Sequence, residues 1–528
     1  MTPAELERSV TDTIERRSAV PAQPRATLLA HREIMTTLYG LLLGMLLAAL
    51  DQNIVTTAVP AIASDLGGFQ HLSWIFAGYL LTATASTPIY GKISDLYGRA
   101  PLLTISISLF VASSAFCALA QNMGQLAAAR ALQGLGGGGM MSVTQALIAD
   151  IIAPRERGRY QAYFAGVWAS ASVAGPMLGG LFVQYLTWRW VFWINLPIGA
   201  AALFLCARAF KKLPKPQMAR RAIDYGGAGL MTLAVTALLL VSTWGGSMFP
   251  WLSTTVLGMF GAGLVLLLLF LVQEFHALDP ILPPRLFASP IFNFANAISF
   301  IVAIAMFGGL VLMPVQIQLV LGITPGSTGL IMIPLMSGTV IGSFIAGRIM
   351  RRTGRYKMIP PVGIGAAAIA LALLSTLDAA TSPILVMAYL AVLGLGVGPT
   401  FPVMMIAIQN TCEPRDVGVA TSWVFFARSL GASFGAALLW SWLLGALTAR
   451  LDAEGHGALA NTLVRGGPVA AGQMAAADRL LIQPALTHAF HIVFLGAAMV
   501  ALAAFALSFF LKEERLKSQV PSHRMEGH

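Results

Sequence analysis

The sequence predicts an all-α integral membrane protein with fourteen transmembrane helices, arranged as two six-helix halves plus two inserted helices. Three observations predict this fold class. Of the 528 residues, 57% are hydrophobic and only 10% are charged, whereas soluble domains carry roughly 25% charged residues. Apolar runs near the ~20 residues that a helix needs to cross a bilayer recur along the chain. The runs lack strict alternation, and open strands cannot satisfy their backbone in lipid.

The first apolar run begins near Met35 and lacks the short apolar region and cleavage pattern of a removable signal peptide. We therefore expect it to remain as the first helix. The expected spans are 36–62, 73–93, 101–121, 125–151, 159–185, 190–210, 226–246, 253–274, 292–321, 326–349, 357–377, 382–410, 418–446 and 486–511. An even number of spans places both termini on one side.

The spans group into domains. We expect a cytoplasmic N-terminal tail (1–35), a six-helix bundle (36–210), a linker with two inserted transmembrane helices (211–285), a second six-helix bundle (286–511) and a cytoplasmic C-terminal tail (512–528). A loop at about 447–485, rich in Ala and Gly, interrupts the second bundle on the external side. It is either a mobile cap over a cavity mouth or a tolerated connector.

The basic residues set the orientation. On the side away from the termini, the loops hold four of the 33 Lys and Arg residues, namely Arg189, Arg450, Arg465 and Arg479. Arg130 and Arg428 lie inside spans, and all the others fall on the side of the termini. The positive-inside rule therefore predicts cytoplasmic termini. The net charge of +11 is then topological, and the scattered basic residues form no nucleic-acid interface.

Two pairs of segments indicate an internal repeat. YGKISDLYGRAPLL aligns with AGRIMRRTGRYKMI, which places Gly91 over Gly347 and Arg99 over Arg355. Residues 134–158 align with 394–418 at nearly the same offset. Duplicated six-helix bundles that meet around a central cavity are typical of transporters. The repeat therefore favours transport over catalysis.

Asp51 lies deep in the first span, in the stretch ALDQNIVTTAVP. A carboxylate there costs roughly 2.5 to 3.5 kcal/mol, which usually marks function. Because removal from water favours the neutral form of a carboxyl group, Asp51 is a candidate proton carrier. Arg130, in the fourth span, is its expected partner if the two helices adjoin. The alternative for both residues is a permanent buried pair that fixes helix packing.

The motif GKISDLYGR ends the second span. Gly91 permits close helix approach, and Gly98 can adopt the positive φ of a tight turn. Asp95 is placed to meet the N-terminus of a neighbouring helix, where a carboxylate is stabilised by ~0.3 to 1 kcal/mol. The second-half copy has Arg351 where Asp95 would stand, so we expect one strong contact of this kind. The alternative is plain loop architecture.

Five motifs in the predicted topology carry a family resemblance: LDQNIVTTAVP, GKISDLYGR, RALQGLGGG, GPMLGG and WRWVFWINLPIG. Together they resemble the fourteen-helix drug:proton antiporters of the major facilitator superfamily, over nearly the whole chain. The resemblance implies that Arg130 takes part in proton coupling. It also implies that Gly91, Asp95, Gly98 and Arg99, with Asp150 of the fourth span and the thirteenth span beginning near Val417, form a gating latch.

The fifth span contains GVWASASVAGPMLGGLF. Gly175 and Gly179 form a small-residue face, and Pro176 removes a backbone hydrogen bond and bends the helix. The resemblance associates this pattern with exporters that exchange substrate for protons. Trp188, Trp190 and Trp193 fit an aromatic belt at the outer interface.

Candidates for a substrate cavity are weaker, because polar residues also join helices to one another. We expect Asn53, Gln145, Trp168 and Gln409 to offer hydrogen bonds or an aromatic face to a substrate. The three cysteines and eight histidines suggest neither a disulfide framework nor a metal site.

The sequence thus predicts a monomeric, proton-driven exporter, without a cofactor, in the cell membrane. Its substrates would be amphipathic compounds, neutral or monocationic, because the later spans hold no second strong acid. Export of an endogenous metabolite, lipid or siderophore is the alternative, and a non-transporting membrane sensor is less expected. An enzyme is disfavoured because no nucleophile and base set is visible, and no GxxxxGK[ST] loop indicates ATP use.

Overall fold

The computed structural model describes residues 31–67, 73–211, 224–246, 248–456, 459 and 476–518. Most of the predicted N-terminal tail, part of the predicted linker and the middle of the predicted external loop lie outside the described residues.

The described chain is all-helical, and one isolated β-bridge joins Gly245 to Phe249. The helices are α2 (His31–Leu66), α3 (Ser73–Tyr97), α4 (Arg99–Leu119), α5 (Met123–Ile151), α6 (Pro154–Tyr185), α7 (Trp190–Trp193), α8 (Asn195–Phe210), α9 (Tyr225–Trp244), α10 (Thr254–His276), η2 (Pro284–Ala288), α11 (Pro290–Leu319), α12 (Pro325–Thr353), α13 (Ile359–Leu374), α14 (Pro383–Val397), α15 (Thr400–Thr411), η3 (Pro414–Asp416), α16 (Val417–Ala453) and α18 (Ala476–Ser508).

Eleven helices of the described chain are long and apolar enough to cross a membrane, which makes this a multi-pass membrane protein. The predicted count of fourteen is not confirmed. The apolar helix α13 has only 16 residues. Helices α3 and α5 have 25 and 29 residues but do not qualify. They are rich in Ser, Thr and Gly, and they pack mainly on each other and on neighbouring helices, so their surfaces need not be apolar.

Helices α2 to α8 form one group with its own apolar cores, which include Leu47, Phe110 and Met140. The most extensive contact is between α3 and α5. Glycines on α5 permit it, since a Cβ at Gly134 or Gly138 would overlap the carbonyl oxygen of Tyr79 or Ala83 of α3. The Thr82 hydroxyl of α3 donates to the Ala131 carbonyl of α5 at 2.7 Å. Close backbone approach and buried hydroxyl bonds therefore hold this group together.

Helices α11 to α18 form the second group around a larger core, in which α11 packs on α16 and α12 packs on α14. The inserted helices α9 and α10 pack on each other, and α9 contacts α3 and α16. Lys92 of α3 donates to Asp279, beyond α10, at 2.5 Å. The inserted pair therefore lies against both groups.

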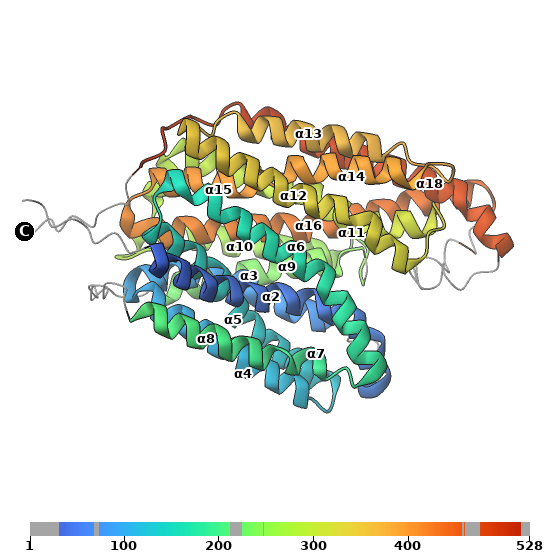
Figure 1. Cartoon of the computed structure of the whole chain (residues 1–528). Coiled ribbons are helices and arrows are strands. Elements are labelled where there is room, and N and C mark those ends of the chain that lie inside the picture. The colour runs from blue at the N-terminus through green and yellow to red at the C-terminus, as the bar shows by residue number, and fades with distance from the viewer. Residues whose placement is uncertain are drawn as a thin grey trace, which may run out of the picture.

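One end of the bundle, here called the basic end, carries Arg99, Arg155, Arg351, Arg355 and Arg415. It lies on the left in Figure 1, where the C-terminal tail leaves the bundle. The two groups meet at this end and spread apart toward the right of the view. Within the described chain, the hydrogen bonds between the two groups all lie at the basic end.

Candidate functional site

Asp51 of α2 is fully buried beside a fully buried Arg130 of α5. The Arg130 Nη1 donates to Asp51 Oδ2 at 2.5 Å. The other carboxylate oxygen, Oδ1, accepts from the Gln133 amide at 2.8 Å and from the Asn195 amide at 2.9 Å. Four helices, α2, α5, α8 and, through Ile75, α3, thus converge on one acid and one base.

Arg130 has partners besides Asp51. Its Nε donates to the Ile75 carbonyl at 3.1 Å, and its Nη1 also donates to Gln133 Oε1 at 2.7 Å. The guanidinium carbon lies 4.5 Å from the centre of the Tyr79 ring. Neutralising Asp51 would leave Arg130 with these neutral partners but without a counter-charge, so the buried guanidinium would become more costly to hold.

At the basic end, Asp95 of α3 caps the first turn of α16 from the other group. Its Oδ1 accepts from the Gly418 N–H at 3.0 Å, and its Oδ2 accepts from the Val419 N–H at 2.9 Å. The residue at the N-cap of α16 is Asp416, whose side chain makes no cap bond. It instead accepts two bonds from Arg285, at 2.8 and 2.9 Å. Asp95 therefore supplies in trans the cap that helix N-termini require.

The surroundings of Asp95 hold it in place. Arg99 forms ion pairs with Asp95 and with Asp150, the second at 3.0 Å. Gly98 has φ of 93°, a conformation that favours glycine. A Cβ at Gly91 would lie 2.7 Å from the Gly418 carbonyl oxygen. The six residues of this cluster, here called the latch, therefore join α3, α4, α5 and α16: Gly91, Asp95, Gly98, Arg99, Asp150 and Gly418.

A second seam, meaning a line of close contact between the two groups, lies where the internal repeat places the counterpart of the latch. A Cβ at Gly158 of α6 would lie 2.6 Å from the Gly347 Cα of α12. Arg155 donates to the carbonyls of Arg351 and Arg352 at 2.8 and 3.0 Å. Here a cation meets the C-terminal carbonyls of a helix, whereas the latch has an anion at a helix N-terminus. Both arrangements complement the helix dipole.

Helix α6 packs on α2 next to the buried acid. A Cβ at Gly175 would lie 2.6 Å from Asn53 Cβ, and one at Gly179 would lie 2.6 Å from the Ile54 carbonyl oxygen. Pro176 lies between them, inside the helix. The two glycines therefore set the distance between α6 and the turn of α2 that follows Asp51.

A central cavity of about 450 Å³ lies between the two groups. Asn53, Gln145 and Trp168 line it, as do Gln52 and Gln161. Gln409 lies outside the lining, because it accepts from Arg157 at 3.1 Å and donates to Thr421 at 2.9 Å. Gln409 therefore belongs to the contact between α6, α15 and α16, not to the cavity wall.

The cavity also contains a residue that sequence reasoning did not select. Arg428 of α16 lines it, with its guanidinium carbon 4.9 Å from the centre of the Phe401 ring and 5.9 Å from that of Phe425. Among the described residues that line this cavity there is no aspartate or glutamate. The only sequence signal was an arginine inside a span.

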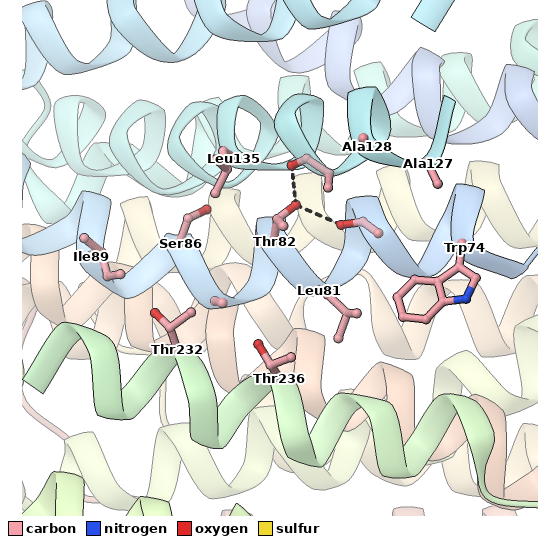
Figure 2. A pocket seen from close by; sticks show the side chains of 13 residues that line it. Trp74, Leu81, Thr82, Ser86, Ile89, Ala127, Ala128, Leu135, Thr232 and Thr236 are labelled. Carbon is pink, nitrogen blue, oxygen red and sulfur yellow. Dashed lines mark hydrogen bonds between the residues drawn. The ribbon is translucent and has the colours of Figure 1, made fainter. Parts of the chain in front are cut away.

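A second hollow, of about 400 Å³, is separate from the central cavity and lies between α3, α5 and α9. Figure 2 shows Thr82 bonded to α5 on one side of it, and Thr232 and Thr236 of α9 on the other. Its lining is almost entirely apolar and consists mostly of small side chains. It offers no charged group to a ligand.

Comparison with known proteins identifies the family of this helical fold. Residues 41–436 match the family model described as Major Facilitator Superfamily. The chain belongs to this superfamily. It is accordingly a transporter, and such proteins are not enzymes.

Two relatives and one solved structure are similar to this transporter. An MFS-type transporter of Mycobacterium tuberculosis is 39% identical over 92% of this chain and 70% of its own length. The multidrug transporter protein MdtP of Bacillus subtilis is 38% identical over 76% of this chain and 73% of its own. The crystal structure of the human organic anion transporter MFSD10 (TETRAN) has a TM-score of 0.58 at 16% identity, over 90% and 99% of the two chains. At this identity the likeness shows the fold alone.

The transporter's structure brings together several residues that the sequence did not indicate. Gln133 and Asn195 bind Asp51, and Ser114 accepts from Asn195 at 2.9 Å. Asn195 lies in the stretch interpreted as an aromatic belt. Trp188 of the same stretch is buried and donates to Asp65 at 2.8 Å, so it does not face lipid. A polar residue inside an apolar run was the available signal for Asn195.

Proposed function

We propose that this major facilitator is a proton-coupled exporter that exchanges amphipathic drugs or toxic compounds for protons by alternating access. The observation that carries the proposal is the buried pair of Asp51 and Arg130. It lies directly beside the cavity, because the next two residues of α2, Gln52 and Asn53, line that cavity. The name of the Bacillus subtilis relative supports a multidrug substrate range.

The geometry supports a specific coupling. Protonation removes the charge of Asp51 and weakens its bond with Arg130, which keeps its partners on α3 and α5. The constraint between α2 and those helices then loosens. Helix α3 carries Ile75 and Tyr79 near this pair and Asp95 at the latch. At 1.5 Å per residue, Ile75 and Asp95 are ~30 Å apart, so α3 connects the proton site with the seam between the halves.

The driving force suffices. One proton entering across 100 mV releases ~2.3 kcal/mol, and one pH unit adds ~1.4. Each tenfold gradient of a neutral substrate costs ~1.4 kcal/mol. One proton per cycle therefore sustains a useful gradient without a bound cofactor.

We place both termini in the cytoplasm of a cell-membrane monomer, because α2 begins at the basic end and the described chain after α18 returns to it (Figure 1), and because basic loops face inward. The arrangement joined at the latch then corresponds to the state closed toward the cytoplasm. The boundaries of two six-helix halves and a two-helix insertion remain part of this proposal.

The test is transport in proteoliposomes with an imposed pH gradient, comparing the natural chain with Asp51→Asn. The variant keeps the shape of the side chain but cannot carry a charge. We expect it to lose accumulation against a gradient while still equilibrating substrate slowly. Uphill accumulation at the natural rate by Asp51→Asn would refute the assignment.

A further inference from the structure

We infer that residues 511–517, which follow α18 and are here called the strap, form a clasp that holds the second seam closed, and that Asn410 positions this clasp. The inference rests on the proposed function, because a clasp has a role only if the two halves separate at the basic end during transport. The latch joins α3 to α16, whereas the strap acts at the seam between α6 and α12. Release of the strap should therefore favour opening toward the cytoplasm.

The strap has no regular secondary structure, yet it follows a fixed course on the second group (Figure 1). The hydroxyl of the fully buried Tyr356 donates to the Lys512 carbonyl at 3.1 Å and accepts from the Glu514 N–H at 3.3 Å. The Leu516 N–H donates to the Gly354 carbonyl at 3.0 Å, and the Leu516 side chain is buried in the core of the second group. A segment after the last helix of a domain is poorly ordered unless it is tied down. The strap is tied down by both backbone bonds and apolar burial.

Asn410, near the end of α15, holds the strap with both ends of its amide. This side chain is buried. Its Nδ2 donates to the Arg515 carbonyl at 3.2 Å, and its Oδ1 accepts from the Lys517 N–H at 2.9 Å. The amide thus uses its donor and its acceptor on the same short piece of backbone. Asn410 therefore fixes the position of Lys517, the residue whose carbonyl faces the first group.

A hydrogen bond from the first group ends on the strap. The Arg155 N–H of α6 donates to the Lys517 carbonyl at 3.3 Å. Arg155 is the second residue of α6, so its N–H is among those that a helix N-terminus leaves without an intrahelical acceptor. Ala153, at the N-cap, makes no side-chain cap bond. The strap therefore supplies in trans an acceptor for α6, as Asp95 does for α16.

The internal repeat explains why the second seam needs a separate acceptor. Helix α6 is the repeat counterpart of α16, and Arg351 stands where the first half has Asp95. A guanidinium cannot accept a hydrogen bond, and a cation is unfavourable at a helix N-terminus. The strap carbonyl takes the place of the missing carboxylate. The Arg155 side chain donates to the carbonyls of Arg351 and Arg352 at 2.8 and 3.0 Å, so Arg155 is bonded across the seam through both backbone and side chain.

This arrangement makes the strap sensitive to conformation. When the halves separate at the basic end, the strap stays with the second group, because Tyr356, Gly354 and Asn410 hold it there. The first turn of α6 then loses its acceptor. Loss of a helix cap changes an equilibrium constant by about threefold to tenfold. The strap should therefore favour the closed arrangement by a factor of this size.

Two truncated chains test the clasp. One chain ends after Arg515, and the matched control ends after Ser518. Both end in a new carboxylate, and they differ only in Leu516, Lys517 and Ser518. We expect the control to keep the open-to-closed ratio of the full chain. The chain that ends after Arg515 should have an open-to-closed ratio about threefold to tenfold higher.

Single-molecule energy transfer in nanodiscs measures this ratio. The dyes are attached at Lys211→Cys, after α8 of the first group, and at Met358→Cys, before α13 of the second group. Both positions are exposed. The background is Cys412→Ser, in which Cys117 and Cys206 are buried. Low transfer then reports separation of the two groups at the basic end.

A substitution tests the same contact without shortening the chain. Asn410→Ala removes both side-chain bonds to the strap and should raise the open-to-closed ratio several-fold. Combined with truncation after Arg515, it should add nothing, because changes that act through one contact are not additive. Asn293→Ala is the matched control, since this exposed amide donates to the Phe287 carbonyl at the start of α11. It should leave the ratio unchanged.

The inference fails if the two truncated chains have the same open-to-closed ratio, or if Asn410→Ala leaves the ratio unchanged. It also fails if Asn410→Ala and the truncation after Arg515 shift the ratio independently. The measurement needs neither substrate nor a proton gradient. A failure of Asp51-coupled transport would therefore leave the clasp standing, and an inactive clasp would leave Asp51-coupled transport to be tested by uptake.

Discussion

At the residue scale, the burial of Asp51 is stabilised by donors from three other side chains, and each donor favours the charged carboxylate. Arg130 supplies charge, whereas Gln133 and Asn195 supply neutral amides. The amides matter because they come from different helices, α5 and α8. The set of donors that surrounds the acid therefore depends on how closely those helices approach α2.

Replacing Asn195 with alanine removes one donor to Asp51 Oδ1 and leaves the buried carboxylate with one partner fewer. A hydrogen bond to a charged group contributes ~1.5 to 3 kcal/mol, so we expect proton-driven accumulation of substrate to fall about tenfold or more. Uptake into proteoliposomes with an imposed pH gradient measures this loss. Asn296→Ala is the control, since that amide donates to the Phe292 carbonyl of its own helix. Unchanged accumulation by Asn195→Ala would contradict the role of the amide.

The sequence indicated Asp51 and Arg130 because isolated charges in apolar spans are conspicuous. It did not indicate Asn195 or Arg428 as site residues, for different reasons. Asn195 follows WRWVFWI, in which the tryptophans suggested an interface position. Arg428 lies in a span with ordinary small and apolar neighbours, and only the packing of α15 shows that Phe401 meets it. Which face of a helix turns toward a cavity is decided by tertiary packing that helical periodicity alone does not specify.

At the element scale, the seam between the halves depends on one helix capping another. The amides of Gly418 and Val419 are the second and third of α16, and helix caps at such positions contribute ~0.5 to 2 kcal/mol. The cap is broken whenever α3 and α16 separate. The cap therefore stabilises the conformation in which α3 and α16 are in contact relative to the one in which they are apart.

We expect Asp95→Asn to weaken the latch, because an amide offers one acceptor oxygen and no charge to Arg99. The rate of interconversion should change several-fold, while equilibrium substrate binding stays nearly intact. Single-molecule energy transfer between labels on the two halves measures the interconversion rate. Equilibrium dialysis measures substrate binding. Asp452→Asn, at the exposed far end of α16, is the control. Lost binding with normal interconversion would refute the latch.

Helix α6 provides a sharper packing test. An alanine at Gly179 would press its Cβ against the Ile54 carbonyl of α2, whereas an alanine at Gly180 meets nothing within 4 Å. Overpacking of this kind costs ~1 to 3 kcal/mol. We expect Gly179→Ala to lower thermal stability in detergent and to slow transport, and Gly180→Ala to do neither. Equal behaviour of the two variants would show that α6 and α2 are not in the close contact described.

Helix positions agree with the apolar runs in the sequence because a bilayer demands ~20 apolar residues wherever helices meet lipid. The agreement between helices and apolar runs is weaker where other helices shield a helix from lipid. Glycine-rich α5 and threonine-rich α3 lie against each other and are too polar to qualify as spans by hydropathy. Their assignment as spans came from the surrounding pattern of apolar runs and not from their own hydropathy.

At the scale of the whole molecule, the partly buried Cys412 lies at the basic end. Burial, together with the carboxylates of Asp95 and Asp416, raises the pKa of the Cys412 thiol to about 12. The thiol therefore stays protonated and slow to react at neutral pH. Opening of this end would hydrate the thiol and restore its usual reactivity.

Alkylation of Cys412 by a maleimide should therefore report the conformation. At pH 8, a fall of the thiol pKa from about 12 to the ordinary value of 9 increases the thiolate fraction, and allowing for lower nucleophilicity the rate rises roughly 30-fold. We expect slow labelling of the natural chain and faster labelling of Asp95→Asn. Cys412→Ser gives the background from Cys117 and Cys206, both buried. Fast labelling of the natural chain, equal to that of the variant, would contradict a closed basic end.

The hollow between α3, α5 and α9 bears on how this closure is reversed. Well-packed interiors resist displacement because every atom has neighbours, and α3 lacks such neighbours along the side that faces Thr232 and Thr236. The inserted segment thus contacts α3 near its two ends, through Trp244 on Trp74 and through Asp279 on Lys92, and leaves a hollow between these contacts. A tilt of the middle of α3 toward α9 would first take up the volume of this hollow. The inserted pair therefore leaves room for movement of α3, the helix that runs from the proton site to the latch.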